Sequence, residues 1–302
     1  MSNIQVNKLH TLSGHNDCIY ALVEGPDPRF FYTGSGDGMV VEWDLDKPKD
    51  GRLIAKVAHS VYALEVDKER NLLFIGHNFE GIHVIDLEKS KEIWSLKITD
   101  QSIFDIKAIG NELYVGTGDG IIIIIDIEQQ SVKKHIKIGK KSIRVFAIDP
   151  TKRQLAAGLS DHSIKVFNLT DHSPIHNLEA HNNSVFALGY SPNKSIMVSG
   201  GRDAHLKIWE TKNYSLQESI VAHMFAINYL SFREDGNYFV TCSMDKSIKV
   251  WDSNSLKLLK VIDKARHAGH GTSINKVLWS SYNQQIVSVS DDRNISIWQI
   301  EL

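Results

Sequence analysis

The sequence predicts an all-β protein in which a four-stranded antiparallel sheet is repeated seven times around a closed ring. Three observations support this prediction. A turn aspartate returns at regular intervals, apolar and polar residues alternate at the period of a strand, and a spare strand at the amino end complements an incomplete last unit. Repetition on this scale is typical of arrays of small units rather than of one spherical core.

The repeated motif is a turn aspartate followed six residues later by an aromatic or apolar residue, as in GSGDGMVVEWD around Asp37. Six copies keep the aspartate, and the copy GHNFEGIHVID has Phe79 in its place. Successive copies lie 40 to 47 residues apart, with turn positions near 37, 79, 119, 161, 203, 245 and 292. Because each unit buries apolar surface only against its neighbours, residues 1–302 are expected to form a single domain.

Within a unit the alternation has a period of two, as Leu206 and Ile208 alternate with His205 and Lys207. Four such segments separated by turns predict an antiparallel meander, for example over residues 183–191, 195–201, 205–211 and 215–223. Five consecutive isoleucines, residues 121–125, favour a strand that adjacent units bury on both faces. Since helical periodicity is lacking, the chain is expected to be almost wholly β.

The two ends of the sequence complement each other. After Asp292 the last unit has a third strand, Asn294 to Ile300, but no fourth, whereas Ile4 to Leu12 is a spare strand before the first unit. Pairing this strand onto the last unit would remove two exposed sheet edges. The sequence therefore predicts a seven-bladed β-propeller of four-stranded antiparallel blades, closed by the N-terminal strand.

Composition restricts the class of partner. The net charge is −2 and the pI about 6.7, so there is no overall basic field to attract nucleic acid. The sequence shows neither a signal-peptide layout nor an apolar run long enough to span a bilayer, so we expect a cytoplasmic protein without membrane contact. Cys18 and Cys242 lack the spacing of a disulfide framework or a zinc cluster.

The pairs Gly14-His15 and Ala180-His181 and the endings Trp43-Asp44 and Trp251-Asp252 resemble the WD-repeat family of β-propellers, and the resemblance covers the whole chain. In that family a hydrogen-bonded tetrad of His, Ser or Thr, Asp and Trp ties each blade. The resemblance assigns four tetrads: His15, Thr33, Asp37 and Trp43; His181, Ser199, Asp203 and Trp209; His223, Thr241, Asp245 and Trp251; and His270, Ser288, Asp292 and Trp298.

The tetrads are expected to be structural. A catalytic triad of His, Ser and Asp would not need four copies, whereas a structural tie would. The histidine pairs His267 with His270 and His172 with His176 lack further ligands at a suitable spacing, so no metal and no cofactor are expected. Units two to four depart from the pattern and are expected to be packed rather than tied, with apolar residues Ile75, Phe79, Ile85, Val115, Ile125, Ala157 and Phe167 at the tetrad positions, and with His59 out of register.

The resemblance further implies that the narrower, top face is the docking surface, reached from the first strand of each blade and from the residue before the turn position. Counting back 17 residues from each turn position, or 15 in the third unit, selects Tyr20, Tyr62, Phe104, Arg144, Phe186, Asn228 and Asn275. The residues before the turn positions add Arg202 and Met244. The hypothesis is that these residues line a partner-binding mouth in which Arg144 and Arg202 pair with a carboxylate or phosphate. The alternative is that the aromatic side chains fold inward and plug the channel.

The leading functional prediction is a non-catalytic scaffold that binds a protein or peptide, as a monomeric propeller within a larger assembly. The second is an enzyme or small-molecule binder that uses the central mouth, with chemistry from Arg144, Arg202, Asp291 or Tyr62. The third is weak nucleic-acid association through a basic stretch, which is more often a solvated outer strand. That stretch comprises Lys133, Lys134, His135, Lys137, Lys140 and Lys141.

Overall fold

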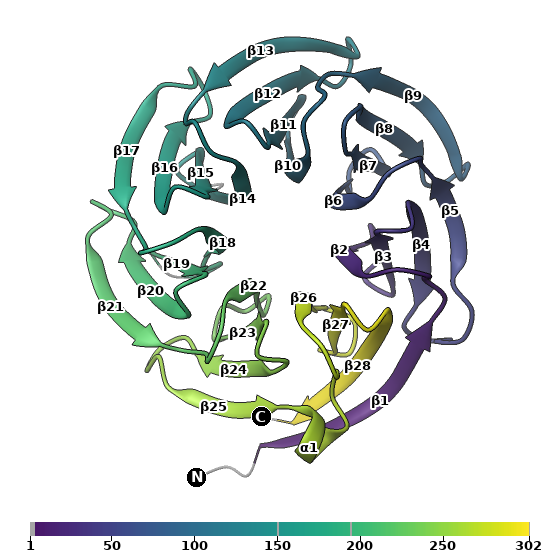
Figure 1. The fold of residues 1–302 in the computed structure, drawn as a ribbon, viewed down its shortest axis with the longest axis vertical. Helices are drawn as coiled ribbons and strands as arrows, with labels where there is room; N and C mark the ends of the chain where they lie inside the picture. Colours follow the sequence, from purple (N-terminus) through teal and green to yellow (C-terminus); the bar gives the residue numbers. More distant parts are fainter. Residues whose placement is uncertain (1–3, 150, 194, 302) are drawn as a thin grey trace.

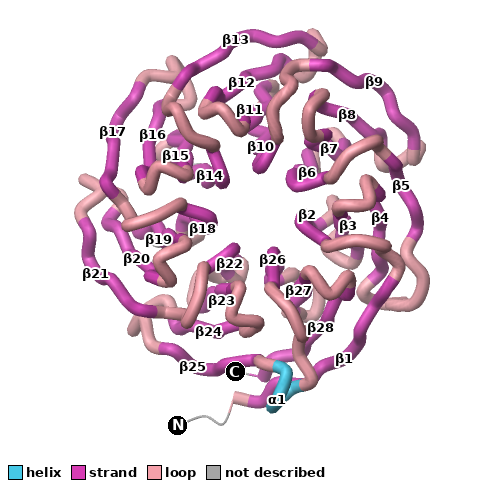
Figure 2. The backbone as a smooth tube through the Cα atoms, in the orientation of Figure 1, coloured by secondary structure: helices cyan, strands magenta, loops and turns pink. Residues whose placement is uncertain are grey.

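The computed structural model describes residues 4–149, 151–193 and 195–301. In this part of the chain, 28 strands form seven antiparallel sheets of four strands, arranged as blades around a central axis (Figure 1). One short helix, α1 (Lys264–His267), interrupts the connection between the sixth and seventh blades (Figure 2). The predicted all-β, seven-bladed propeller is confirmed.

Each blade contributes four strands, counted from the axis outward. The innermost strands are β2 (Ile19–Glu24), β6 (Val61–Asp67), β10 (Ile103–Ile109), β14 (Ile143–Asp149), β18 (Val185–Tyr190), β22 (Ile227–Phe232) and β26 (Ile274–Trp279). The second strands are β3 (Phe30–Ser35), β7 (Leu72–His77), β11 (Glu112–Thr117), β15 (Gln154–Leu159), β19 (Ile196–Gly201), β23 (Tyr238–Ser243) and β27 (Ile286–Ser290). The third strands are β4 (Met39–Asp44), β8 (Gly81–Asp86), β12 (Ile121–Asp126), β16 (Ser163–Asn168), β20 (His205–Glu210), β24 (Ile248–Asp252) and β28 (Asn294–Glu301). The outermost strands are β5 (Arg52–Lys56), β9 (Lys91–Lys97), β13 (Ser131–Lys137), β17 (Pro174–Glu179), β21 (Leu216–Val221), β25 (Leu258–Ile262) and, in the last blade, β1 (Gln5–Ser13).

The ring closes through the first strand of the chain. The last sheet has the order β1-β28-β27-β26, and β1 pairs antiparallel with β28 from Gln5 opposite Glu301 to Ser13 opposite Asn294. The predicted closing strand therefore forms, one residue later than expected at each end. Without β1 the outer edge of β28 would be unpaired, so this pairing supplies the backbone hydrogen bonds that a lone edge would lack.

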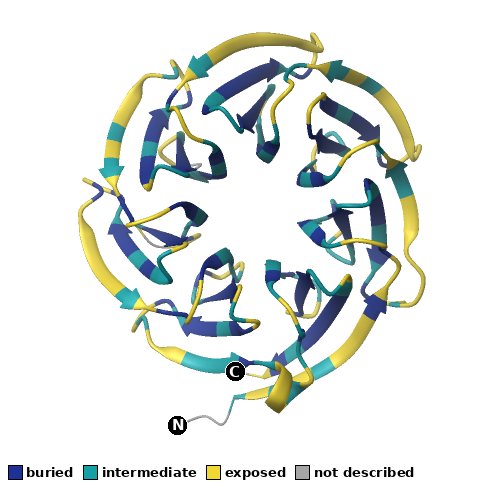
Figure 3. Ribbon diagram, viewed as in Figure 1, coloured by how far each residue is buried: buried dark blue, intermediate teal, exposed yellow. Residues whose placement is uncertain are grey.

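Burial follows the position of each strand in its blade. Figure 3 shows the second and third strands largely buried and the outermost strands largely exposed. The alternation expected of a strand with one solvated face is clearest in the outer strands, where exposed and half-buried residues interchange, as along β9.

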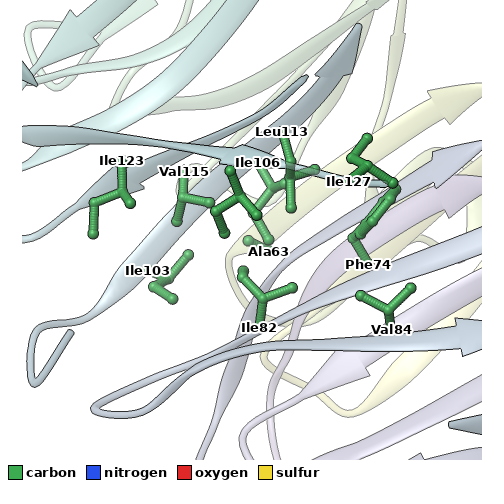
Figure 4. Close-up of a cluster of buried hydrophobic side chains, with 11 residues drawn as sticks. Ala63, Phe74, Ile82, Val84, Ile103, Ile106, Leu113, Val115, Ile123 and Ile127 are labelled. Atoms are coloured by element: carbon green, nitrogen blue, oxygen red, sulfur yellow. The ribbon is translucent and has the colours of Figure 1, made fainter. Parts of the chain in front are cut away.

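The apolar core lies between blades rather than at one centre. The cluster in Figure 4 joins residues of the second blade, such as Phe74 and Ile82, to residues of the third, such as Ile106. Along β12, Ile123 and Ile125 pack into this cluster, whereas Ile122 and Ile124 pack into the next cluster with the fourth blade. The strand of isoleucines is thus buried on both faces, as predicted, except that its first member, Ile121, is half-buried.

Candidate functional site

A hollow of about 390 Å³ lies where the first strands of the blades converge. Its lining includes the whole set selected by counting back from the turns, which comprises Tyr20, Tyr62, Phe104, Arg144, Phe186, Asn228 and Asn275. All of these residues are half-buried. They therefore surround a space that is open to solvent instead of filling a closed core.

Five of the lining side chains form a continuous arc of stacked groups. The ring centroids of Tyr20 and Tyr62 lie 4.6 Å apart, and those of Tyr62 and Phe104 lie 5.7 Å apart. The guanidinium carbon of Arg144 lies 3.9 Å from the centroid of Phe104 and 5.0 Å from that of Phe186. Because a cation is attracted to the face of an aromatic ring, the two phenylalanines hold Arg144 in place between adjacent blades.

The remaining two residues of the selected set, both asparagines, tie neighbouring blades together. The Asn228 side-chain amide donates to the carbonyl of Ile274 at 2.8 Å, and that of Asn275 donates to the carbonyl of Ile19 at 2.9 Å. Asn275 also donates to the carboxylate of Asp291 at 2.7 Å. These bonds use the amide donors on the protein itself, so the charged donors at the hollow are its cations.

Sequence reasoning missed a second cation of the hollow, Lys276, whose ammonium lies 3.8 Å from the ring centroid of Tyr229. Among the described residues, no acid forms an ion pair with Lys276 or Arg144. Burial lowers the pKa of the Arg144 guanidinium to about 10, which reflects the loss of water around a charge without a counter-ion. In several other units the residue directly after the selected one is small. A comparison of these positions would therefore have singled out Lys276, which directly follows Asn275.

The hollow continues into a second space of about 290 Å³ further along the same first strands. There, Lys107 pairs with Glu65 at 2.6 Å, and Lys68 pairs with Glu24 at 2.8 Å. Lys107 and Lys68 are therefore neutralised by the protein's own acids, whereas Lys276, which lines both spaces, has no acidic partner among the described residues. Arg144 differs from Lys107 and Lys68 in being held against aromatic rings instead of an acid.

Two of the residues proposed for the mouth do not line the hollow. Arg202 is exposed in the turn between β19 and β20, and Met244 is exposed in the equivalent turn between β23 and β24. Arg202 and Arg144 consequently do not form one clamp. Other residues at the equivalent position are engaged within the protein, since Asp291 accepts a hydrogen bond from Asn275 and Asn78 accepts one from the backbone N–H of Ile103.

The four predicted sets of tetrad residues are hydrogen-bonded to one another. In the sixth blade, Trp251 Nε1 donates to Thr241 Oγ1 at 2.9 Å, Thr241 Oγ1 lies 2.8 Å from His223 Nε2, and His223 Nδ1 lies 2.8 Å from Asp245 Oδ2. The same three contacts, all between 2.8 and 3.3 Å, are present in the sets of His15, His181 and His270. Each imidazole thus has a partner on both nitrogens, and each indole N–H has an acceptor.

The tetrad aspartates also hold the rim. Asp37 Oδ2 accepts from the backbone N–H of Asn16 at 2.7 Å, and Asp37 Oδ1 accepts from that of Met39 at 2.8 Å. One carboxylate therefore fixes both the loop that enters the first strand and the turn between the second and third strands. Burial by itself would raise the pKa values of Asp203 and Asp245. Hydrogen bonds, among them those from His181 and His223, outweigh this effect, so both pKa values are lowered.

The family model described as "WD domain, G-beta repeat" matches residues 6–44, 172–210, 214–252 and 262–299. The chain belongs to the WD40 family. The matched ranges cover half of the sequence and contain the four sets of tetrad residues. WD40 propellers are commonly scaffolds for protein interactions and are typically non-catalytic. A search of curated proteins found no match.

The tetrad positions of units two to four of this WD40 propeller lie outside the matched ranges. Most of the apolar residues at these positions are buried, among them Ile75, Val115 and Ala157, each with 0% of its surface exposed. The exception is Phe79, which was expected to be packed but is 53% exposed in its turn. These blades are held by apolar packing where the others carry hydrogen bonds. Replacing a buried polar network with apolar side chains of fitting shape is compatible with stability.

Blade two contains a histidine network that the sequence did not reveal. The backbone N–H of His59 donates to His77 Nε2 at 3.0 Å, and His77 Nδ1 lies 2.8 Å from Glu80 Oε2 and 3.2 Å from His83 Nε2. His77, Glu80 and His83 lie close enough together to hold a metal ion. However, the N–H of His59 requires an unprotonated Nε2, so the proton of neutral His77 is on Nδ1, the atom that would bind the metal. The geometry therefore favours a hydrogen-bonded network over a metal centre.

The protonation of buried histidines makes the stability of this WD40 propeller depend on pH. Burial is the main cause that lowers the pKa of His15, His77 and His223. The unfolded chain binds protons more readily than the fold, so this contribution to stability is present above pH about 6.5 and is lost as the pH falls below it. The carboxylates with lowered pKa values add a second loss below pH about 4.

We therefore expect urea midpoints to decrease in two steps between pH 8 and pH 3. The variant His77→Gln removes one buried titrating imidazole and should give a shallower first step. A midpoint that stays constant from pH 7.5 to pH 5 would contradict this assignment.

Three of the other candidate residues, Lys133, Lys137 and His172, have structural partners. Lys133 pairs with Glu112 at 2.5 Å on the outer strand β13, and Lys137 donates to the carbonyl of Asp119 at 2.6 Å. His172 Nε2 lies 3.2 Å from Glu112. Within the ranges that the structure describes, no helix is long and apolar enough to cross a bilayer.

Proposed function

We propose that this protein is a non-catalytic interaction scaffold that binds a segment of a partner protein at the central hollow. The environment of Arg144 is the observation that supports this proposal best. Its guanidinium is desolvated, is positioned by two aromatic rings and has no acidic partner among the described residues. An acidic side chain or a carboxyl terminus of the partner would supply the missing counter-ion. Lys276, which lines the same hollow, adds a second positive charge.

The aromatic residues supply the apolar part of the contact. Tyr20, Tyr62, Phe104 and Phe186 are half-buried, so each offers part of a ring that a partner can still cover. Tyrosine and arginine are the residue types most often found to dominate binding energy, and rigid stacking reduces the entropy lost on association. The cytoplasm is the proposed location, and a monomer within a larger assembly is the proposed state.

The test is capture of a partner by purified wild-type protein, followed by titration of the identified partner by calorimetry. Arg144→Met keeps the aliphatic stem but removes the charge, and we expect it to weaken binding at least tenfold. The double variant Tyr62→Ala and Phe104→Ala should abolish capture while changing the melting temperature little.

Lys134→Ala, on the exposed outer strand β13, is the matched control that removes a surface charge far from the hollow. Unchanged affinity in the Arg144 variant would refute the proposal. Turnover of a small anionic molecule bound in the hollow would instead favour the enzyme alternative, since the volume suits a small ligand.

A further inference from the structure

Blade six carries an apolar patch on its rim, which we call the blade-six patch. It consists of Met224 (82% exposed), Phe225 (56% exposed) and Met244 (56% exposed). Met224 and Phe225 lie in the loop that enters β22, and Met244 lies in the turn between β23 and β24. Large apolar side chains that are exposed together are typical of interaction sites.

The other blades show that the fold does not require these side chains. The two residues equivalent to Met224 and Phe225 are polar or small in every other unit: Asn16 and Asp17, Ala58 and His59, Asp100 and Gln101, Lys140 and Lys141, Asn182 and Asn183, and Gly271 and Thr272. The residues equivalent to Met244 are Gly36, Asn78, Gly118, Ser160, Arg202 and Asp291. In the six other blades, the loop before the first strand and the turn between the second and third strands thus form without a large apolar residue at any of these positions. The patch therefore has a role other than the folding of its blade.

Hydrogen bonds hold the patch in a fixed arrangement. The backbone N–H of Met224 donates to Asp245 Oδ2 at 3.0 Å, and that of Met244 donates to the carbonyl of Ala226 at 3.0 Å. The hydroxyl of Ser243 donates to the carbonyl of Phe225 at 3.3 Å. Since both loops are already ordered, a partner that covers the patch pays little conformational entropy in its backbone.

The charges next to the patch are positive. Arg202, Lys246 and Arg293 are exposed in the corresponding turns of blades five, six and seven, and none of them forms an ion pair among the described residues. In blade five, the hydroxyl of Ser184 donates to the carbonyl of Ser160 in the preceding turn. The same bond joins Ser60 and Ser142 to the turns of the preceding blades. Since Ala226 and Arg202 occupy the equivalent positions in blades six and five, we infer that the turn of Arg202 lies beside the loop of the patch.

The acids of these turns are already engaged. Asp203, Asp245 and Asp292 each accept hydrogen bonds from their tetrad histidine and from a backbone N–H, as in the bond from Gly271 to Asp292 at 3.2 Å. These three carboxylates are half-buried, whereas Arg202, Lys246 and Arg293 are exposed, so the charge that is most accessible to a partner here is cationic.

We propose that the blade-six patch is a second docking surface, whose occupant is an amphipathic segment of a partner protein that combines large apolar with acidic side chains. The apolar side chains cover Met224, Phe225 and Met244, and the acidic ones pair with Arg202 and Lys246. This surface is separate from the hollow, and its test uses different residues.

Selection of a random 12-residue phage-displayed peptide library on the wild-type protein tests this inference. We expect the enriched peptides to combine Asp or Glu with Leu, Phe or Trp. For a synthetic peptide of an enriched sequence, the triple variant Met224→Ser, Phe225→Ser and Met244→Ser should raise the Kd at least tenfold. The double variant Arg202→Gln and Lys246→Gln should raise it severalfold and reduce its salt dependence.

Phe79→Ser is the matched control, because Phe79 is a large apolar residue that is 53% exposed in the equivalent turn of blade two. It should leave the Kd unchanged, and so should Arg144→Met at the hollow. The inference is wrong if no peptide is enriched, if the enriched peptides are basic, or if they bind the triple variant as tightly as the wild type. A wild-type dimer in sedimentation that the triple variant dissociates would also overturn it, because the occupant would then be a second copy of the chain.

Discussion

Deletion of residues 1–13 is expected to lower the free energy of unfolding by at least about 5 kcal/mol, which is comparable with the whole stability of many domains. The deletion removes β1 and with it the fourth strand of the last blade. It uncovers the backbone edge of β28 and the apolar contacts that Leu12, only 4% exposed, makes between the last blade and the first. Urea denaturation followed by tryptophan fluorescence measures the loss.

A synthetic peptide of residues 4–14 added to the shortened protein provides the control. Because the peptide restores the missing strand without restoring the covalent link, it should recover most of the lost stability at saturating concentration. A shortened protein with the midpoint and cooperativity of the full chain would show that β1 is dispensable, contrary to the closure seen in the sheet order.

Thr241→Val is expected to cost about 2–6 kcal/mol, although it preserves the shape of the side chain. The hydroxyl of Thr241 is the shared partner of His223 Nε2 and Trp251 Nε1, so its removal leaves two buried polar atoms without a partner, each at about 1–3 kcal/mol. Valine is the natural residue at the equivalent position of blade three, where Val115 has apolar neighbours. Chemical denaturation of the purified variant measures the loss.

A double-mutant cycle separates the lost hydrogen bonds from a general packing defect. In a protein that already carries His223→Phe, one of the two orphaned atoms no longer exists, so Thr241→Val should cost clearly less than in the wild type. Equal costs in the two backgrounds would mean that the hydroxyl does not hold the network together.

The fold could be predicted from the sequence because repetition supplies the same information several times. Even the copy with Phe79 in place of aspartate keeps its register, with Gly76 opposite Ile82 as Gly34 is opposite Val40. The residues around the hollow could be located by counting for the same reason, since each first strand keeps a fixed offset from its turn.

Contacts and exposures that occur only once around the ring could not be predicted in this way. The contact of Lys276 with Tyr229 joins two blades, and neither residue follows the consensus of its position. The network of His77 depends on a backbone N–H of a different loop, which no spacing rule describes. To predict that Met224 and Phe225 are exposed, one would have to know which loop residues point away from the core.

The pairing of β1 with β28 also sets the order of events during synthesis of the chain. The ribosome makes β1 long before β28, so the edge of β1 stays unpaired until β28 has emerged. The entropy cost of joining such distant segments grows only slowly with their separation, but the waiting strand is free to pair wrongly in the meantime. Completion of the ring therefore waits for β28, and the emergence of that strand determines when closure begins.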